Sequence, residues 1–284
     1  MAGEPQHAMA VTRAADRDRY LSVLYAPEEK RGALFALYAF NSAIAGIRDR
    51  VSEPLPGAVR LQFWRDALAM GVSHGGGEAE GAPLVIALTQ TIREHGLPLD
   101  PFLNMLDARE FDLYDDPMPS RNDLEGYCGE TASALIQLAS LVLDPAAARG
   151  VAEIAGHAGC AQAIAGLLRL LPIHRRRGQC YVPADVMAAA GIDREAFLSG
   201  RDGSGAERVI AAMVALGRDH AARFETLARD LVPALRPAFL PAGLAPAYFG
   251  RLEGKGVRAL DEVAEIPAWR RHWIMFRRAT SGWG

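Results

Sequence analysis

The chain has 284 residues, half of them hydrophobic, and carries a formal net charge of −3. This length suits one large domain or two ordinary ones, and the slightly acidic balance argues against a general nucleic-acid-binding protein. The three cysteines, at positions 128, 160 and 180, lack the CxxC spacing of zinc sites and disulfide frameworks, which favours a reducing, intracellular compartment.

Helical patterns begin early in the chain. Residues 1–18 lack the apolar core of a signal peptide and are expected to form a flexible lead-in. Residues 28–47 predict a buried helix, because two glutamates open the segment and its later part is apolar on nearly every side. Residues 57–72 predict an amphipathic helix, whereas the Gly- and Glu-rich segment 73–82 predicts a loop.

Helices are expected to continue to the C-terminal end. Their predicted positions are 83–95, 101–113, 122–143, 147–171, 206–232, 256–264 and 268–279. Residues 233–249 are rich in proline and are expected to form short pieces. The sequence shows no alternating strand pattern and no apolar run long enough to span a membrane. It therefore predicts an all-α fold, with a single domain over residues 19–284.

Two pairs of potential metal ligands stand at helical spacing. His157 and Cys160 lie at positions i and i+3 of one predicted helix, but no third ligand accompanies them, so packing in the core is the favoured interpretation. Asp112 and Asp116 could direct two carboxylates at one magnesium ion. Two prolines follow this pair closely, however, and a solvated, acidic helix end is the favoured interpretation.

A cluster of arginines follows the helical stretch that ends near Pro172. Arg175, Arg176 and Arg177 are consecutive, and no carboxylate lies within residues 167–182. Such a cluster either forms a solvated turn or binds an anion such as a lipid headgroup. The solvated turn is favoured, and the anion or headgroup contact stays open.

Four stretches resemble the squalene/phytoene synthase superfamily. They read YAPEEKRGALFALYAF, RLQFWRDAL, LEGYCGETAS and RRGQCYVPAD, and the similarity runs from about Arg19 to Arg278. The resemblance implies an isoprenoid synthase fold, which is a single bundle of α-helices around a central cavity. Enzymes of this family join two prenyl diphosphates, and their two aspartate-rich motifs hold the magnesium ions that make diphosphate a leaving group.

By this resemblance, the counterparts of the two aspartate-rich motifs are Ala45, Gly46, Asp49, Arg169, Leu170 and His174. Asp49 and Arg169 match the motifs, whereas the other four residues stand where the enzymes have aspartates. Loss of these acids removes the magnesium clamp, so the resemblance implies no catalytic residue and no cofactor, magnesium included. His174 is expected to form a hydrogen bond within this degenerate former site rather than to bind a metal.

The replacements resemble one branch of the superfamily, the non-catalytic assembly factors of mitochondrial complex I and their bacterial counterparts. The matching residues are Phe40, Asn41, Asp49, Val51, Ser52, Glu53, Gln62, Phe63, Trp64, Gln162, Arg169, Pro172 and His174. The resemblance implies a bacterial assembly factor for respiratory complex I (NADH:quinone oxidoreductase), with complex I subunits or other assembly factors as partners. Two alternatives stay open: a prenyl diphosphate-condensing transferase, and a carrier that binds a lipid or quinone in the former active-site cavity.

Several of the branch-like residues are candidates for docking a partner protein. They are Asn41, Asp49, Ser52, Glu53, Gln62 and Trp64. The acidic stretch among them, at the end of the predicted buried helix, could instead form a capping and salt-bridge network around Arg48, Arg50 or Arg60. Both interpretations stay open.

The C-terminal helix is the candidate membrane contact. The residues concerned are Trp269, Arg270, Arg271, Trp273, Arg277 and Arg278. A basic helix with an aromatic face can lie in a membrane interface, or it can close the bundle with its arginines outward, which the family resemblance favours. The expected location is cytoplasmic or peripheral on the inner membrane, which corresponds to the matrix side for eukaryotic relatives. An anionic lipid surface or a bound lipid is a further expected partner.

Overall fold

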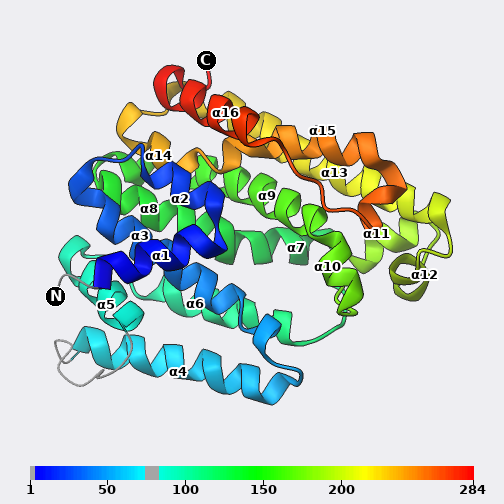
Figure 1. The fold of residues 1–284 in the computed structure, drawn as a ribbon, viewed down its shortest axis with the longest axis horizontal. Coiled ribbons are helices and arrows are strands. Elements are labelled where there is room, and N and C mark those ends of the chain that lie inside the picture. Colours follow the sequence, from blue (N-terminus) through cyan, green and yellow to red (C-terminus); the bar gives the residue numbers. More distant parts are fainter. Residues whose placement is uncertain (1–3, 74–82) are drawn as a thin grey trace. The chain divides into compact units, whose positions relative to one another are not determined.

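The computed structural model describes residues 4–73 and 83–284. All regular elements in these residues are helical, as the ribbon in Figure 1 shows, and no strand occurs among them. The all-α fold class predicted from the sequence is therefore confirmed. None of the helices in the described ranges combines the length and the apolar character that crossing a membrane requires.

The chain forms two compact units, each assembled from segments that lie apart in the sequence. The first comprises Met1–Tyr114, Ala134–Ala152 and Val232–Leu240, and the second comprises Asp115–Ser133, Glu153–Leu231 and Pro241–Gly284. This division does not test the single domain predicted over residues 19–284, which stays a prediction.

The first unit is built around one buried helix. Its helices are α1 (Glu4–Ala15), α2 (Arg17–Val23), α3 (Glu28–Ala45), α4 (Pro54–Ser73), α5 (Pro83–His95), α6 (Asp100–Glu110), α8 (Ala134–Leu143) and α14 (Arg236–Phe239). Residues 34–41 of α3 are all buried, which confirms the prediction made from the apolar stretch. Helices α1, α5 and α8 pack against α3 (Figure 1), so its apolar side chains are removed from water on several sides.

Helix α1 corrects the prediction of a flexible lead-in over residues 1–18. Ala8 and Thr12 on α1 are fully buried, and the Thr12 hydroxyl donates a hydrogen bond to the Phe35 carbonyl of α3 at 3.2 Å. The prediction fails because small side chains let α1 approach α3 closely, without the wide apolar face that identifies a helix in a sequence.

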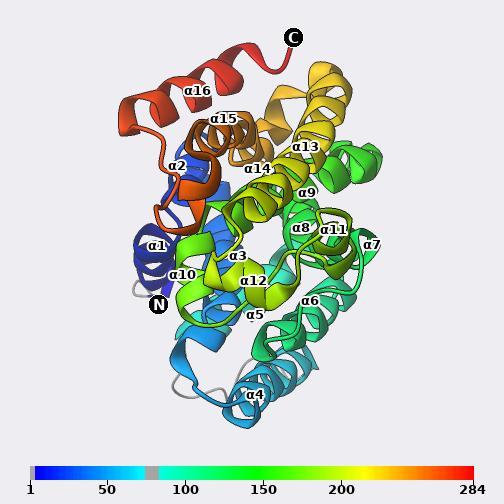
Figure 2. The ribbon, with the colours of Figure 1, turned by 90° about the vertical axis from the view of Figure 1, so that its right-hand side faces the viewer.

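The second unit contains a closely packed pair of α-helices. Its helices are α7 (Arg121–Cys128), α9 (Ala152–Arg169), α10 (Leu171–Arg176), α11 (Ala184–Ala189), α12 (Arg194–Ser199), α13 (Gly203–Leu227), α15 (Ala245–Lys255) and α16 (Ala268–Ser281). Helices α13 and α15 lie side by side in Figures 1 and 2. Gly217 permits this approach, because a β-carbon at that position would clash with the Phe249 ring.

Several predicted boundaries differ from the structure. The stretch 122–143 contains α7, the π-helical turn η3 (Gly129–Ser133) and α8 rather than one regular helix. The predicted helix at 256–264 is a 3-10 helix, η8 (Gly256–Leu260), and the proline-rich stretch begins, as predicted, with short pieces before α15. Residues 1–3 of the lead-in and 74–82 of the predicted loop lie outside the described residues.

Candidate functional site

The first degenerate motif lies where α3 ends. Ala45 is the last residue of α3, Gly46 caps the helix, and Asp49 follows on the turn η1 (Arg48–Arg50) with an exposed side chain. A β-carbon added at Gly46 would lie 3.1 Å from Nη2 of Arg50. A guanidinium therefore covers a position where the resemblance places an acid in the enzymes, and its positive charge repels a divalent cation.

The candidate docking residues divide into buried and exposed ones. Asn41 is 7% exposed, and Trp64 is 8% exposed with its ring edge-on to Phe40, at 5.1 Å between the ring centroids. The prediction that these two residues dock a partner is wrong, because both side chains belong to the core of the first unit. The docking role of the others stays a prediction, and the exposed residues of this set are Asp49, Ser52, Glu53 and Gln62.

The two arginines of η1 act locally. Arg48 donates from Nη1 to the Val51 carbonyl at 3.1 Å, while Arg50 covers Gly46. The Arg48 guanidinium thus helps to fix the chain between α3 and α4. The capping and salt-bridge network proposed for the acidic stretch around them stays a prediction.

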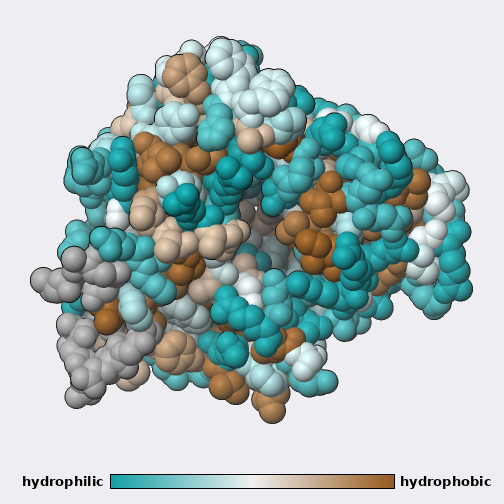
Figure 3. All heavy atoms as spheres, viewed as in Figure 1, coloured by the Kyte–Doolittle hydropathy of each residue, from teal (hydrophilic) through white to brown (hydrophobic). Residues whose placement is uncertain are grey.

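The outer side of α4 carries a row of apolar side chains. Leu55, Val59, Phe63 and Met70 are each more than half exposed, and their spacing places them along one side of the helix. Figure 3 shows brown, hydrophobic side chains at its lower edge, where Figure 1 places α4. A contiguous exposed apolar surface of this kind is typical of a protein-interaction site.

The second degenerate motif lies in the second unit, at the junction of α9 and α10. Arg169 donates from Nη1 to the Tyr248 hydroxyl at 3.0 Å, and its guanidinium lies 5.0 Å from the centroid of the Tyr248 ring. Arg271 donates to the same hydroxyl at 3.1 Å and to the Glu265 carboxylate at 3.4 Å. The retained motif arginine is therefore part of a polar cluster, hereafter the tyrosine cluster, formed by Arg169, Tyr248, Glu265 and Arg271.

The other two residues of the second motif present no carboxylate. Leu170 precedes α10 and is partly buried. The His174 ring packs against the Tyr181 ring at 4.8 Å between centroids, and the Tyr127 ring lies 6.4 Å from Tyr181. His174 thus belongs to an aromatic group in the second unit, and the hydrogen bond expected for it stays a prediction.

The first residue of the arginine turn, Arg175, makes contacts within the second unit. The Arg175 guanidinium donates to two backbone carbonyls of α12 and pairs with the Asp261 carboxylate. The alternative of a headgroup contact is therefore wrong for Arg175, because the second unit itself uses its donors. Arg176 and Arg177 are exposed, and their contact with an anion stays a prediction.

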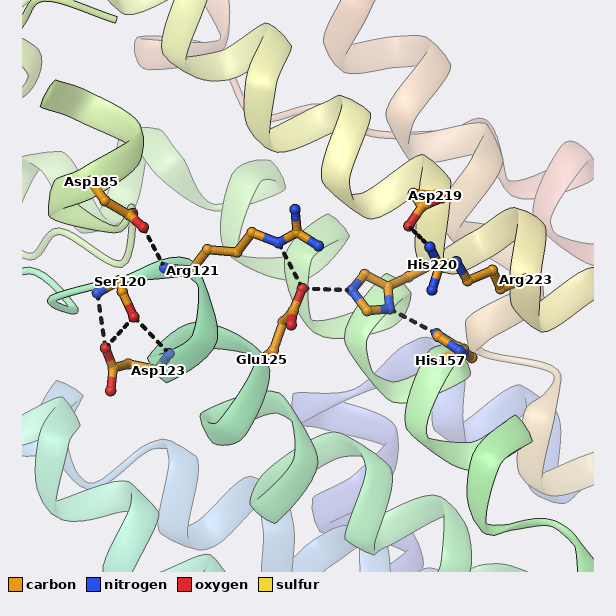
Figure 4. A network of polar contacts seen from close by, with 9 residues as sticks. All are labelled: Ser120, Arg121, Asp123, Glu125, His157, Asp185, Asp219, His220 and Arg223. Atoms are coloured by element: carbon orange, nitrogen blue, oxygen red, sulfur yellow. Dashed lines mark hydrogen bonds and ion pairs between the residues drawn. The ribbon is translucent and has the colours of Figure 1, made fainter. Parts of the chain in front are cut away.

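A polar chain that the sequence did not predict joins three helices of the second unit (Figure 4). The Glu125 carboxylate of α7 lies 3.2 Å from Nε2 of His220 on α13, and Nδ1 of His220 lies 3.0 Å from Nδ1 of His157 on α9. The Arg121 guanidinium donates to Glu125 at 2.9 Å. We call these four residues the histidine chain.

Local sequence rules place the α7 end of the histidine chain. Ser120 and Asp123 form a capping box that begins α7. Asp185 of α11 accepts a hydrogen bond from the Arg121 amide at 3.0 Å and so ties α11 to the start of α7 (Figure 4). The serine–aspartate spacing was visible in the sequence, whereas nothing in it paired Glu125 with a histidine about 95 residues away.

The proton positions in the histidine chain follow from its chemistry. An ionised Glu125 can only accept, so Nε2 of His220 carries a proton, and Nδ1 of a neutral His220 accepts from Nδ1 of His157. Burial lowers the pKa of His157, and the neighbouring His220 ring adds to the effect. Burial alone would raise the pKa of Glu125, but hydrogen bonds from Arg121 and His220 outweigh it and lower this pKa. With this assignment, a proton added at Nδ1 of His220 would place two donors face to face and break the contact between the rings, whereas a proton added at Nε2 of His157 would leave that contact in place.

The residue pairs weighed as metal ligands have other roles. Cys160 is buried, and a hydrogen bond with the Cys128 thiol lowers the pKa of Cys160, while His157 belongs to the histidine chain. Asp112 is buried and pairs with Arg109 at 3.0 Å, so the solvated position favoured for it is wrong. Among residues 4–73 and 83–284, no group of three or more His, Cys, Asp or Glu side chains could hold a metal ion.

The C-terminal helix α16 is oriented differently from the favoured prediction. Its exposed aromatic residues, each more than half exposed, are Trp269, Trp273 and Phe276. Arg271 is 7% exposed within the tyrosine cluster, and Arg278 pairs with Glu225 of α13. The predicted outward direction of the arginines is therefore wrong for Arg271 and Arg278, while Arg270 and Arg277 are exposed.

The chain is similar to known proteins of two kinds. A rat (Rattus norvegicus) protein named NADH dehydrogenase (ubiquinone) complex I, assembly factor 6, is 31% identical over 256 residues, which is 87% of this chain and 73% of that protein. A phytoene synthase from Mycobacterium tuberculosis is 24% identical over 245 residues, which is 84% of this chain and 77% of that enzyme.

The fold and the family follow from two further findings. The fold is similar to that of a squalene synthase from Alicyclobacillus acidocaldarius, with a TM-score of 0.73 and 22% identity over 89% of this chain and 94% of that structure. It is therefore the isoprenoid synthase fold that the sequence predicted. The squalene/phytoene synthase profile matches residues 12–273. Because that match spans most of its length, the chain belongs to the squalene/phytoene synthase family.

Proposed function

We propose that this chain is a non-catalytic member of its family that assists the assembly of respiratory complex I. Its similarity to proteins named complex I assembly factor 6 supports this function. The observation that carries the proposal is the arrangement at the first degenerate motif, where the Arg50 guanidinium lies beside Gly46 and neither Ala45 nor Gly46 offers a carboxylate to a metal ion.

The chemistry of prenyl transfer supports the non-catalytic part of the proposal. A prenyl diphosphate carries several negative charges, and its departure requires magnesium held by carboxylates. Ala45, Gly46 and Leu170 offer no ligand to such an ion, and Arg169 is engaged by Tyr248. The residues present at the two motifs do not fit a magnesium site, so magnesium is not expected to take part in the function.

The exposed surface of the first unit supports a binding function. An assembly factor acts by contact with its client or with other assembly factors, and large apolar surfaces in contact with water are uncommon unless they bind something. The row of Leu55, Val59 and Phe63 on α4 is such a surface, and Gln62 beside it is an exposed predicted docking residue. We propose that complex I subunits or other assembly factors contact this side of α4.

The test uses a strain from which the gene is deleted. Assembled complex I, measured by native electrophoresis and by the NADH:quinone activity of the membranes, should fall severalfold and return with the wild-type gene. The double variant Val59→Ser with Phe63→Ser should not restore it, because the docking row is lost. A matched control, Leu24→Ser with Val232→Ser, removes two exposed apolar side chains elsewhere and should restore it fully.

Three outcomes would favour the alternatives instead. The phytoene synthase relative supports an enzyme, and release of diphosphate from farnesyl or geranylgeranyl diphosphate by the purified protein with magnesium, at about one per second or faster, would refute the non-catalytic assignment. A deletion strain with normal complex I but a missing polyprenyl product would refute the assembly function. The carrier alternative predicts a lipid or quinone that co-purifies with the protein.

A further inference from the structure

The outer side of α16 consists of aromatic and cationic side chains. Helical spacing places Trp269, Trp273 and Phe276 in one row, with Arg270 and Arg277 along one flank of it. The rings of Trp273 and Phe276 stack at 6.3 Å between centroids. Figure 3 shows pale and tan rings at its upper edge, where Figure 1 places α16. The helix contains no acidic residue.

The inner side of α16 fixes this orientation. Met275 is fully buried, Arg271 donates to Tyr248 and Glu265, and Arg278 pairs with Glu225. After the helix ends, Trp283 is 4% exposed and lies edge-on to Phe224 at 5.2 Å between ring centroids. Turning the aromatic row inward would break these charge-assisted contacts. The contacts of Arg271 and Arg278 therefore keep the aromatic row exposed to water.

The outward arginines carry uncompensated charge. The acids near α16, Glu225 and Glu265, pair with Arg278 and Arg271 on its inner side. Within the described part of the chain, no carboxylate pairs with Arg270 or Arg277, and both are exposed. The aromatic row is therefore accompanied by two positive charges that attract an anionic surface.

We infer that α16 is a docking helix for an anionic lipid surface. Tryptophan and phenylalanine rings gain by leaving water at the interface, where the indole N–H stays wet, and the two arginines approach lipid phosphates. The helix would lie along the surface rather than across the bilayer. An anionic lipid surface offers phosphates to both arginines and an apolar boundary to the three rings at the same time, and the helix contains no acidic residue that such a surface would repel. This inference goes beyond complex I assembly and does not depend on it.

Vesicle binding by the full-length protein tests the inference. We expect the protein to float with vesicles of phosphatidylcholine and phosphatidylglycerol, to stay behind with vesicles of phosphatidylcholine alone, and to be released by salt. Tryptophan emission should shift to the blue on binding. Trp64 and Trp283 are buried, so the change reports on Trp269 and Trp273. Absence of binding to anionic vesicles, equal binding to neutral ones, or an unchanged emission would overturn the inference.

Matched variants locate the contact. Arg270→Gln with Arg277→Gln should weaken binding about thirtyfold, since each arginine near an anionic surface contributes a factor of about five. Arg60→Gln with Arg93→Gln removes the same charge from exposed positions in the first unit and should bind like the wild type. Trp273→Ser should weaken binding without changing the melting temperature, because the side chain is exposed. If both double arginine variants lost the same amount of vesicle binding, the binding would depend on net charge alone, and the role of α16 would be overturned.

Discussion

Replacing Arg271 by glutamine should destabilise the second unit, although the residue lies on a helix whose outer side is exposed. The Arg271 side chain is 7% exposed and donates to the Tyr248 hydroxyl at 3.1 Å and to the Glu265 carboxylate at 3.4 Å. Glutamine is too short and uncharged to replace both contacts. The sequence pattern alone would have placed this arginine in water, so the variant tests the inward orientation directly.

The expected loss follows from the exposure of each partner. A buried hydrogen bond from a charged group contributes about 1.5–3 kcal/mol. The Glu265 side chain is 55% exposed, so its ion pair with Arg271 is screened by water and adds no more than about 0.5 kcal/mol. Tyr248 keeps a donor, because Arg169 still bonds its hydroxyl at 3.0 Å. The free energy of unfolding should therefore fall by about 2–3 kcal/mol, which lowers the melting temperature by roughly 5 °C.

Urea unfolding followed by circular dichroism measures this loss. The matched control is Arg270→Gln, the adjacent residue of α16, whose side chain is exposed. The control should change the free energy of unfolding by less than about 0.5 kcal/mol. Equal unfolding midpoints for the two variants would show that Arg271 is not anchored in the tyrosine cluster and that its contacts do not hold the aromatic row of α16 outward.

Two further predictions concern the histidine chain and the degenerate motif. The pKa of His157 is lower in the folded protein than its ordinary 6.5, so the unfolded chain binds more protons between the folded pKa and 6.5, and stability should fall as the pH drops below about 6.5. His157→Gln should flatten this dependence in melting curves, and an equally steep dependence in the variant would contradict the role of His157. The double variant Ala45→Asp with Gly46→Asp restores two acids at the first motif. Magnesium should not raise its melting temperature, because Arg50 would pair with the new carboxylates. A magnesium-dependent rise in the melting temperature of this variant, with Arg50 present, would contradict the role given to Arg50.

Long, regular apolar patterns were the part of the structure that sequence reasoning predicted well. The helices expected at 28–47 and 57–72 are α3 and α4, because in both the apolar spacing is sustained over several turns. The amphipathic character expected for the second is wrong, because apolar side chains such as Phe63 and Met70 also line the exposed side of α4. Helix α1 was missed since its buried side uses alanine and threonine, which do not stand out by hydropathy. Local periodicity also could not show that Trp64 faces the core rather than a partner.

The histidine chain marks a different limit. His157 was weighed only with Cys160, its neighbour on the same helix, because spacing along one helix is visible in a single sequence. Its actual partner, His220, lies about 63 residues further on, and only the packing of α9 and α13 brings the two rings to 3.0 Å. A single sequence contains no signal for such a pair, whereas the capping box of α7 could be predicted from four consecutive residues.

The hydropathy of its residues could not show which side of α16 is buried. Both sides of this helix can be buried in principle, because aromatic rings gain by leaving water and arginines gain by pairing with buried acids. The residues that determine the orientation lie outside the helix. Glu225 on α13 pairs with Arg278, and Tyr248 and Glu265 accept hydrogen bonds from Arg271. These contacts hold the inner side in place and leave the aromatic row in water. The inner and outer arginines should therefore be separable in experiment, with Arg271→Gln lowering stability and Arg270→Gln with Arg277→Gln lowering only vesicle binding.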